Sequence, residues 1–181
     1  NEKKELKTIV VTEAGRKSVI FAATLLRRSY LEAAKAEPKK DGVQFAFYKN
    51  AFKSVKEIEQ ATPTETGETK SIQLAQFAKK IDLKEPFAVT FDGYLNIPND
   101  GIYEFQLESD DGAVLWIGDE IVVDNDGLHS AQSLTGVVPL RKGFHHLRLK
   151  FIQGGGDIAL NLRWGIKGTG LRRISGSELK Y

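Results

Sequence analysis

Apolar side chains recur at every second position over much of residues 87–164, which is the signature of strands that bury one face. At the centre of this stretch, the sequence YEFQLESDDGAVLW (103–116) carries two such runs, separated by Asp110-Asp111-Gly112. A glycine suits a tight turn because it tolerates positive φ. The pattern therefore predicts an antiparallel hairpin with two adjacent carboxylates at its tip.

Similar alternating runs predict further strands before and after this hairpin, separated by turns that contain Gly. They cover residues 43–48, 87–91, 121–123, 137–140, 144–153 and 158–164. Short strands at regular spacing without a long helix indicate an all-β fold, an antiparallel β-sandwich or barrel.

Four segments between these runs lack a clear strand pattern. Residues 52–60 fit a loop or one helical turn, and residues 72–81 fit a strand or a helix, because periodicity does not decide between them. The polar run 62–70 predicts an exposed loop. Residues 124–136 predict a loop too long for a hairpin turn, and loops of that length are often functional.

Residues 1–41 are predicted to be a separate N-terminal arm with a linker, and residues 42–181 to be the main domain. Two β-rich runs within residues 6–26 predict a β-hairpin. Residues 29–38 have the composition of a linker or one short helical turn, and turn residues follow at 39–42. We expect the hairpin to be poorly covered by the main domain.

Charge is distributed unevenly along the chain, although the net charge is only +2. Residues 1–40 hold ten Lys and Arg against five Glu, whereas residues 85–140 hold no Lys or Arg and eleven Asp and Glu. Nucleic-acid binding needs clustered cations, so this class of partner is excluded. An acidic β-domain favours a cation or a neutral polar ligand, although most of these carboxylates are expected to be solvated surface groups.

Composition sets further limits. The absence of cysteine excludes disulfides and thiolate metal sites. No apolar run approaches 18 residues, so membrane insertion through a helix is not expected. Because the chain begins Asn-Glu-Lys-Lys and contains no Met, we expect it to be a processed or excised piece.

The sequence FDGYLNIPNDGIYEFQLESDDGAVLWIGDEIVVDN (91–125) resembles the protective-antigen-type domain, a β-barrel module often fused to glycosidases and adhesins. The resemblance covers about the last three-quarters of the chain. Its matching positions are Phe91, Gly93, Tyr94, Ile97, Pro98, Gly101, Tyr103, Phe105, Ser109, Asp110, Asp111, Gly112, Asp124, Gly127, His129, Leu140, Gly143 and Trp164.

A second resemblance concerns the arm. The run TIVVTEAGRKSVIFAATLL (8–26) is similar to the last hairpin of the small β-sandwich that follows the catalytic barrel in bacterial hexosaminidases. The alternative is an extra hairpin that packs on the main domain.

The first resemblance implies a calcium site. Neighbouring strand residues normally point to opposite faces, and adhesins of the family make two such aspartates converge through a cis peptide. It implies Asp110, Asp111 and Asp157 as metal ligands, with Gly155 beside the ligand. The Asn that adhesins carry in the matching loop has no clear counterpart here. The alternative is a tight turn whose aspartates cap backbone amides. We predict that the Asp110-Asp111 tip and the 154–157 loop lie side by side at one end of the barrel.

No catalytic residue is predicted. Eleven acids within 56 residues make some carboxylate pair at glycosidase spacing inevitable, so such a pair carries no weight. His129, His145 and His146 lack metal-site spacing and are expected to be one half-buried and two surface residues. Trp116 and Trp164 are candidates for stacking on a sugar. Each is expected in the core instead, because it shares a strand face with apolar residues.

The sequence thus predicts a non-catalytic carbohydrate-binding or accessory module of a secreted bacterial glycoside hydrolase, most like a β-N-acetylhexosaminidase. The alternatives are a calcium-dependent, adhesin-like lectin and a structural spacer. The expected partner is a glycan or the catalytic domain of the same polypeptide. The expected location is secreted, periplasmic or at the cell surface.

Overall fold

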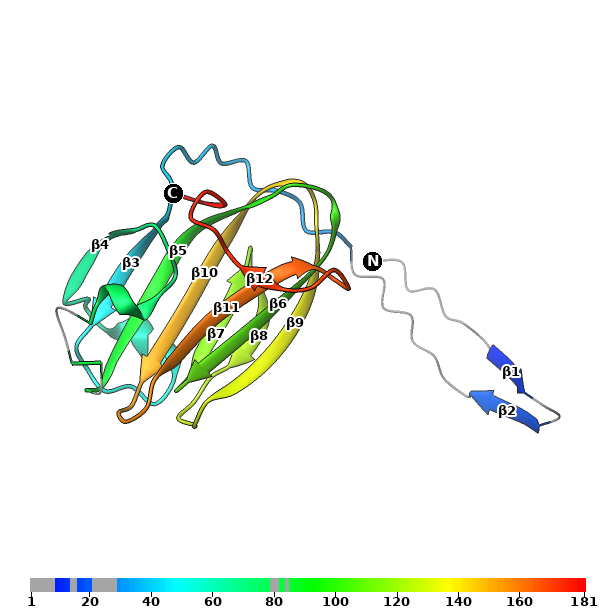
Figure 1. The fold of residues 1–181 in the computed structure, drawn as a ribbon, viewed down its shortest axis with the longest axis horizontal. Coiled ribbons are helices and arrows are strands. Elements are labelled where there is room, and N and C mark those ends of the chain that lie inside the picture. The colour runs from blue at the N-terminus through cyan, green and yellow to red at the C-terminus, as the bar shows by residue number, and fades with distance from the viewer. Residues whose placement is uncertain (1–8, 14–15, 21–28, 79–81, 84) are drawn as a thin grey trace.

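A computed structural model describes residues 9–13, 16–20, 29–78, 82–83 and 85–181 of the chain. Two antiparallel β-sheets account for most of the residues from 43 onward (Figure 1). The described residues include no helix with the length and apolar character needed to cross a membrane.

The N-terminal hairpin consists of β1 (Ile9–Glu13) and β2 (Arg16–Ile20), which pair antiparallel with Ile9 opposite Ile20. The predicted pair of strands is therefore confirmed for these residues. The rest of the predicted hairpin and the burial of its side chains lie outside the described residues. Its poor coverage by the main domain stays a prediction.

The larger sheet has the strand order β4-β3-β5-β10-β7-β8, with β13 also paired to β5. Its strands are β3 (Val43–Tyr48), β4 (Glu65–Thr69), β5 (Phe87–Ile97), β7 (Ala113–Ile117), β8 (Glu120–Asn125), β10 (Gly143–Gln153) and β13 (Leu179–Lys180). The smaller sheet has the order β12-β11-β6-β9. Its strands are β6 (Gly101–Asp110), β9 (Gln132–Leu140), β11 (Ala159–Ile166) and β12 (Arg172–Arg173).

The alternating apolar residues form the core between the two sheets. Fully buried side chains include Phe91, Phe105, Leu149, Phe151 and Trp164, which come from both sheets. Burial of one such side chain contributes about 1.5–3 kcal/mol to stability. The predicted all-β antiparallel sandwich is confirmed.

Two predicted loops are wrong in extent. Residues 62–70 contain β4, which pairs with β3 with Phe45 opposite Gly67. A polar sequence can form this strand because it lies at the edge of the sheet, where half of its surface meets water. The predicted loop 124–136 shrinks to residues 126–131, since β8 ends at Asn125 and β9 begins at Gln132.

The two segments that periodicity left open contain 3-10 helices. The first, η1 (Val55–Gln60), buries Val55 and Ile58 in a second apolar cluster on the outer face of the larger sheet, together with Phe52 and Ile152. The second, η2 (Leu74–Gln76), buries Leu74 against the main core. Of the two alternatives for the second segment, its described residues, 72–78, form a short helix and no strand.

Residues 29–41, grouped with the arm in the sequence, run in extended form along the sandwich, without a helix. Leu31 forms a parallel bridge to Leu140, and its side chain packs on the main core. The Leu31 N–H donates to Pro139 O at 2.9 Å, and the Arg141 N–H donates to Leu31 O at 3.1 Å. This segment is therefore fixed to the sandwich by backbone hydrogen bonds and apolar contact.

Candidate functional site

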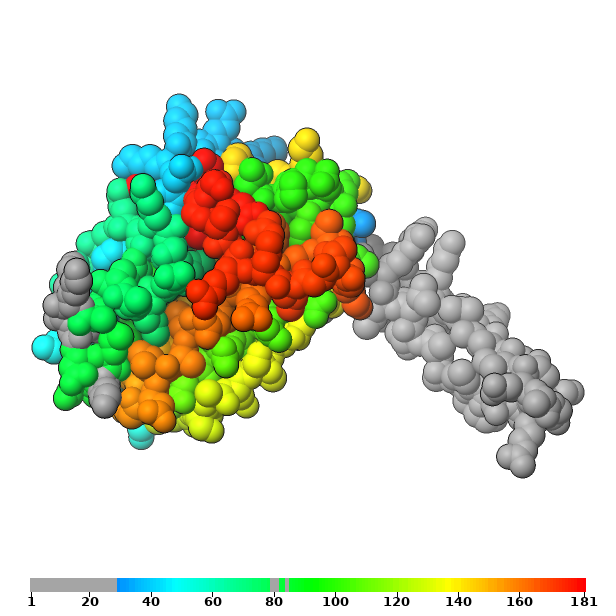
Figure 2. Space-filling view, in the orientation of Figure 1, coloured from blue at the N-terminus to red at the C-terminus, as the bar shows by residue number. Residues whose placement is uncertain are grey.

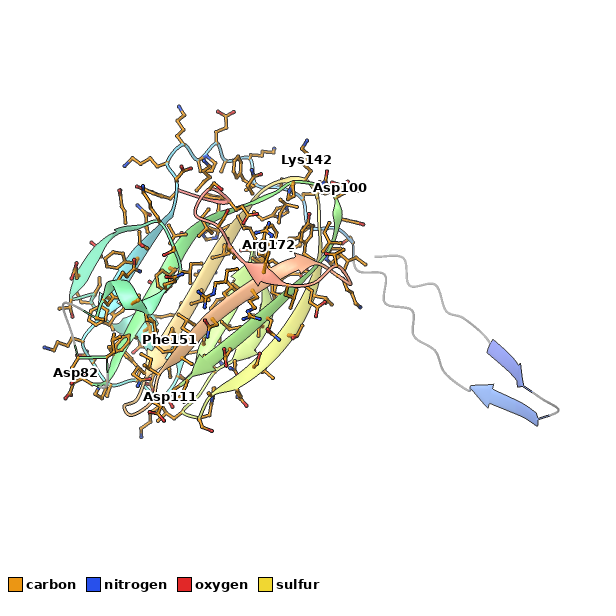
Figure 3. The ribbon with its side chains drawn as sticks, viewed as in Figure 1. Asp82, Asp100, Asp111, Lys142, Phe151 and Arg172 are labelled. Atoms are coloured by element: carbon orange, nitrogen blue, oxygen red, sulfur yellow. The ribbon has the colours of Figure 1, made fainter. Side chains whose placement is uncertain are left out.

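Three connections meet at the end of the sandwich where β6 stops. They are the β6–β7 turn (111–112), the β8–β9 loop (126–131) and the β10–β11 loop (154–158). Strand register explains the meeting, because Ala159 pairs with Asp110 and Gln132 pairs with Ser109. We call this end the aspartate edge. Asp111 lies there, whereas Asp100 and Lys142 lie at the opposite end (Figure 3).

Asp111 links the three connections through its side chain. Its Oδ1 accepts a hydrogen bond from the His129 N–H at 2.9 Å, and its Oδ2 accepts one from the Gly154 N–H at 2.7 Å. As a residue, Asp111 is only 8% exposed. Hydrogen bonds to a charged acceptor in such a site are about twice as strong as neutral ones. The capping of backbone amides expected as the alternative for this turn is therefore present at Asp111.

Asp110 differs from its neighbour, to which it is joined by a cis peptide bond. As a residue it is 9% exposed. Among the described residues, no hydrogen bond or ion pair to its carboxylate is formed. The Asp110 carboxylate therefore keeps its full acceptor capacity available for a ligand.

Gln153 carries a second available acceptor at the same edge. It is fully buried at the end of β10, and its Nε2 donates to Asp157 O at 3.0 Å. Its Oε1 has no hydrogen-bond partner. The Ile152 N–H donates to Gly112 O at 2.8 Å, one residue beyond the last β7–β10 pair, so the end of β10 lies next to the β6–β7 turn. From the sequence, Gln153 falls at the start of the loop expected to supply ligands, but it was not among the predicted site residues.

Gly155 and Asp157 lie in the β10–β11 loop, next to the tip as predicted. Gly155 has a φ of +124°, a conformation that favours glycine. The Asp157 side chain is exposed, and its contribution to the edge is the carbonyl that Gln153 binds. Within the described ranges, no three His, Asp or Glu side chains are arranged to hold a metal ion together. A cation at this edge would therefore need oxygens other than three carboxylates.

A buried polar network supports the edge from below. Asn125 Nδ2 donates to Ser109 Oγ at 2.8 Å, and Gln132 Nε2 donates to Asn125 Oδ1 at 2.6 Å. The ring of His129 lies against this network, with Nε2 at 3.1 Å from Asn125 O. These hydrogen bonds join the end of β8 to the start of β9 and hold the loop between them in one position. Asn125 and Gln132 were not singled out in the sequence.

Positive charge is scarce around the two aspartates. Neither Asp110 nor Asp111 has an ion pair with a Lys or Arg of the described residues, in keeping with the cation-free stretch 85–140. Two adjacent carboxylates repel each other, and a bound cation removes that repulsion. The edge is thus suited electrostatically to a divalent cation.

The histidines and tryptophans lie elsewhere or in structural roles. His145 is buried with Nε2 at 2.7 Å from Arg141 O, and burial lowers the pKa of its imidazole. His129 and His146 are half-buried rather than fully exposed, because each contacts backbone or a carboxylate. Trp164 is buried against Tyr103 with ring centroids 5.4 Å apart, as the alternation predicted. Trp116 is half-buried beneath the Arg148 guanidinium.

Comparison with known families and curated proteins gives two matches. The family model described as PA14 domain matches residues 39–175 of the chain. The chain is also similar to a beta-hexosaminidase of Porphyromonas gingivalis (strain ATCC BAA-308 / W83), with 26% identity over 158 residues. That alignment covers 83% of the chain and 20% of the relative, so the chain spans about a fifth of the relative's length.

Solved structures share the fold. The PA14 sugar-binding domain from an RTX adhesin has a TM-score of 0.66 and 19% identity, covering 78% of this chain and 98% of that one. The A domain of epithelial adhesin 9 from Candida glabrata, in complex with Galb1-3GlcNAc, has a TM-score of 0.62 and 12% identity, covering 85% of this chain and 95% of that one. At these identities the likeness shows the fold alone.

Proposed function

The chain belongs to the PA14 domain family, and we propose that it is a calcium-dependent carbohydrate-binding module of a secreted bacterial glycoside hydrolase. The observation that carries the proposal is a pair of available acceptors at the aspartate edge. They are the Asp110 carboxylate, which has no hydrogen bond from a described residue, and Gln153 Oε1, which is buried without a partner. A buried polar oxygen without a partner is stabilised by a ligand that satisfies it.

The residues at the edge suit calcium in kind and number. Calcium takes six to eight oxygen ligands from carboxylates, carbonyls and water. Asp110 and Gln153 would supply side-chain oxygens, and the β10–β11 loop would supply backbone carbonyls. Asp111 can contribute as well, because each carboxylate oxygen keeps a second lone pair beyond the amide it accepts. Bound calcium would supply positive charge and coordination positions for sugar hydroxyls.

The loops around the aspartates would orient the sugar. Leu128 in the β8–β9 loop is 53% exposed and lies beside Gly154, so it offers an apolar surface to one face of a sugar ring. Asp111 holds this loop against the β10–β11 loop through its two amide bonds. A glycan would then meet a preformed rim, which lowers the entropy lost on binding.

The similarity to a beta-hexosaminidase supports the proposal that the parent protein is a glycoside hydrolase of this kind. A chain similar to part of a beta-hexosaminidase fits an accessory domain that holds N-acetylated glycans near a catalytic domain of the same polypeptide. The proposed location is outside the cytoplasm, where such glycans occur. Fold likeness to a sugar-binding adhesin domain equally suits a free-standing lectin, which the same experiment would detect.

Calorimetric titration of chelator-treated protein with Ca²⁺ tests the proposal. It is followed, with and without the metal, by titration with the trimer of N-acetylglucosamine, here called chitotriose. We expect saturable heat of calcium binding in the wild type and loss of it in Asp110→Asn, which keeps the shape of the side chain. Asp119→Asn is the matched control, because Asp119 is exposed in the β7–β8 turn. If the wild type shows no heat of calcium binding, the calcium site is refuted. If chitotriose binds equally with and without calcium, the domain is a lectin that does not depend on calcium. Absence of binding to any tested glycan would favour a structural spacer.

A further inference from the structure

The first half of β11 is an open strand edge. On one side β11 pairs with β6 over its whole length, whereas on the other side β12 pairs only with Arg163 and Trp164. Among the strands that the structure describes, none pairs with residues 159–162 on that side. Their backbone N–H and C=O groups on this side are therefore available for a ligand.

A groove of about 330 Å³ lies along this edge. One wall is the segment 71–75, which belongs to the other layer, and the opposite wall is β11 with Arg173 and Ile174. In Figure 2 the blue-green surface near residue 70 stands beside the orange and red surface of β11 and the C-terminal segment. The groove combines an apolar floor with polar groups at its rim. The apolar side chains are Ile72, Leu74, Ile158, Leu160, Leu162 and Ile174.

Arg173 lines the end of the groove, and Arg163 lies beside it on β11, outside the lining. Arg163 and Arg173 are directly opposite each other in the β11–β12 pair. Arg173 donates to Asn161 Oδ1 at 3.3 Å, and neither guanidinium forms an ion pair with a described carboxylate. Glu108 on the same sheet face accepts from Asn161 at 2.8 Å instead. Like charges directly opposite on paired strands destabilise them, so an anion bound between these arginines is stabilising.

Arg172, next to Arg173 on β12, differs from these two arginines because it has an ion-pair partner. Arg172 forms an ion pair with Glu178, which raises the pKa of the Arg172 guanidinium through that hydrogen bond. Arg172 is thus occupied in holding the C-terminal segment. Arg163 and Arg173 have no such role, and a planar guanidinium binds a carboxylate through two parallel hydrogen bonds.

The groove continues from the aspartate edge. Ile158 and Ala159 line its beginning, and Ala159 is the residue that pairs with Asp110. From Ala159 to Arg163 the strand advances four residues, about 13 Å at about 3.3 Å per residue. An extended chain bound at the aspartate edge can therefore follow β11 and reach the arginines.

We propose that this groove is a second subsite of the same glycan-binding site and that it selects a carboxylate-bearing sugar. The carboxylate binds Arg173 and Arg163, the sugar hydroxyls bond to Asn161 and the open backbone edge of β11, and the carbon face of the ring packs on Ile158 and Ile174. This inference rests on the proposed function, since it extends the glycan from the aspartate edge.

A matched pair of trisaccharides tests the groove on the 181-residue chain in the presence of Ca²⁺. Trigalacturonate and galactotriose differ by carboxylates in place of hydroxymethyl groups. We expect trigalacturonate to bind about tenfold more tightly, the effect of one hydrogen bond to a charged group. In Arg173→Gln this advantage disappears, and in Arg163→Gln it decreases. Lys167→Gln, which removes an exposed cation outside the groove, is the control and retains the full advantage.

The outcomes separate the two proposals. Equal binding of both trisaccharides, dependent on calcium, overturns the acidic subsite and leaves the proposed function intact. An acidic preference that survives in Arg173→Gln also overturns the subsite, because the carboxylate then binds elsewhere, for instance at calcium. If neither of the two trisaccharides nor chitotriose binds, both proposals are overturned. Equal melting temperatures of the variants establish that the exposed substitutions leave the fold unchanged.

Discussion

The Asp111 carboxylate accepts the backbone N–H of Gly154 at 2.7 Å, across 43 residues of sequence. This bond joins the tip of one hairpin to the loop of another, and the second oxygen of Asp111 binds the loop that contains His129. Asp111 therefore has a structural role at the aspartate edge, whereas the carboxylate of Asp110, one residue earlier, has no hydrogen-bond partner among the described residues. The two aspartates should respond differently to substitution.

Replacement of Asp111 by Ala should lower the free energy of unfolding by about 1–3 kcal/mol, because two partly buried amides lose a charged acceptor. Asp110→Asn should change it by less than about 0.5 kcal/mol in calcium-free buffer, since it breaks no described bond. Chemical denaturation of both variants measures the difference. Similar losses for the two would contradict the division of roles.

Gly112 should not tolerate a side chain. A Cβ at this position would lie 2.5 Å from Gly127 O and 2.7 Å from Gly127 N, both backbone atoms. Gly112→Ala should therefore displace the β8–β9 loop and cost about 1–3 kcal/mol of stability, as overpacking does. Gly101→Ala is the control, because a Cβ there meets only the Tyr103 ring at an ordinary 3.5 Å. Thermal melting that fails to distinguish the two variants would refute the contact.

Protonation of His145 should destabilise the fold. Burial lowers the pKa of this imidazole from its ordinary value of 6.5, so the unfolded chain binds the proton more tightly than the folded one. The stabilising contribution is complete above pH 6.5 and is lost as the pH falls from 6.5 through the lower pKa of the folded state. Melting temperatures between about pH 5 and pH 8 should fall towards acid in the wild type. The slope should be shallower in His145→Gln, and identical slopes would exclude His145 as its source.

Truncation should separate the arm from the segment that follows it. A chain that starts at Ser29 should keep the stability of the full chain, in line with the expected poor coverage of the hairpin. A chain that starts at Glu37 loses the Leu31 bridge and the bond from Ala34 N to Phe144 O. Its stability should fall by about 2–4 kcal/mol, from lost apolar burial and backbone hydrogen bonds. A comparable fall in the longer chain would show that the hairpin packs on the sandwich.

Local sequence determined the strands and the tip. Side chains alternate across a strand with a period of two. The burial of Phe105, Leu107 and Leu149 can therefore be predicted from the alternation of apolar and polar residues around them. The turn at Gly112 follows from the same local information. The alternation fails for β4, where polar residues form an edge strand because β3 supplies the hydrogen bonds. The alternation also does not predict where the β8–β9 loop ends, because the first four residues of β9 are all exposed.

Only the tertiary structure decided which groups meet. The pairing of β11 with β6 sets Asp110 beside Ala159, and the bond from Ile152 N to Gly112 O holds the end of β10 next to the β6–β7 turn. The pairing of β12 with β11 likewise brings Arg173 against Arg163 and leaves the rest of that edge open. None of these relations follows from periodicity. Periodicity predicts which face of a strand a residue occupies, but it does not predict which strand lies next to it. Partner choice depends on contacts between residues far apart in the chain, and the candidate site is built from those contacts.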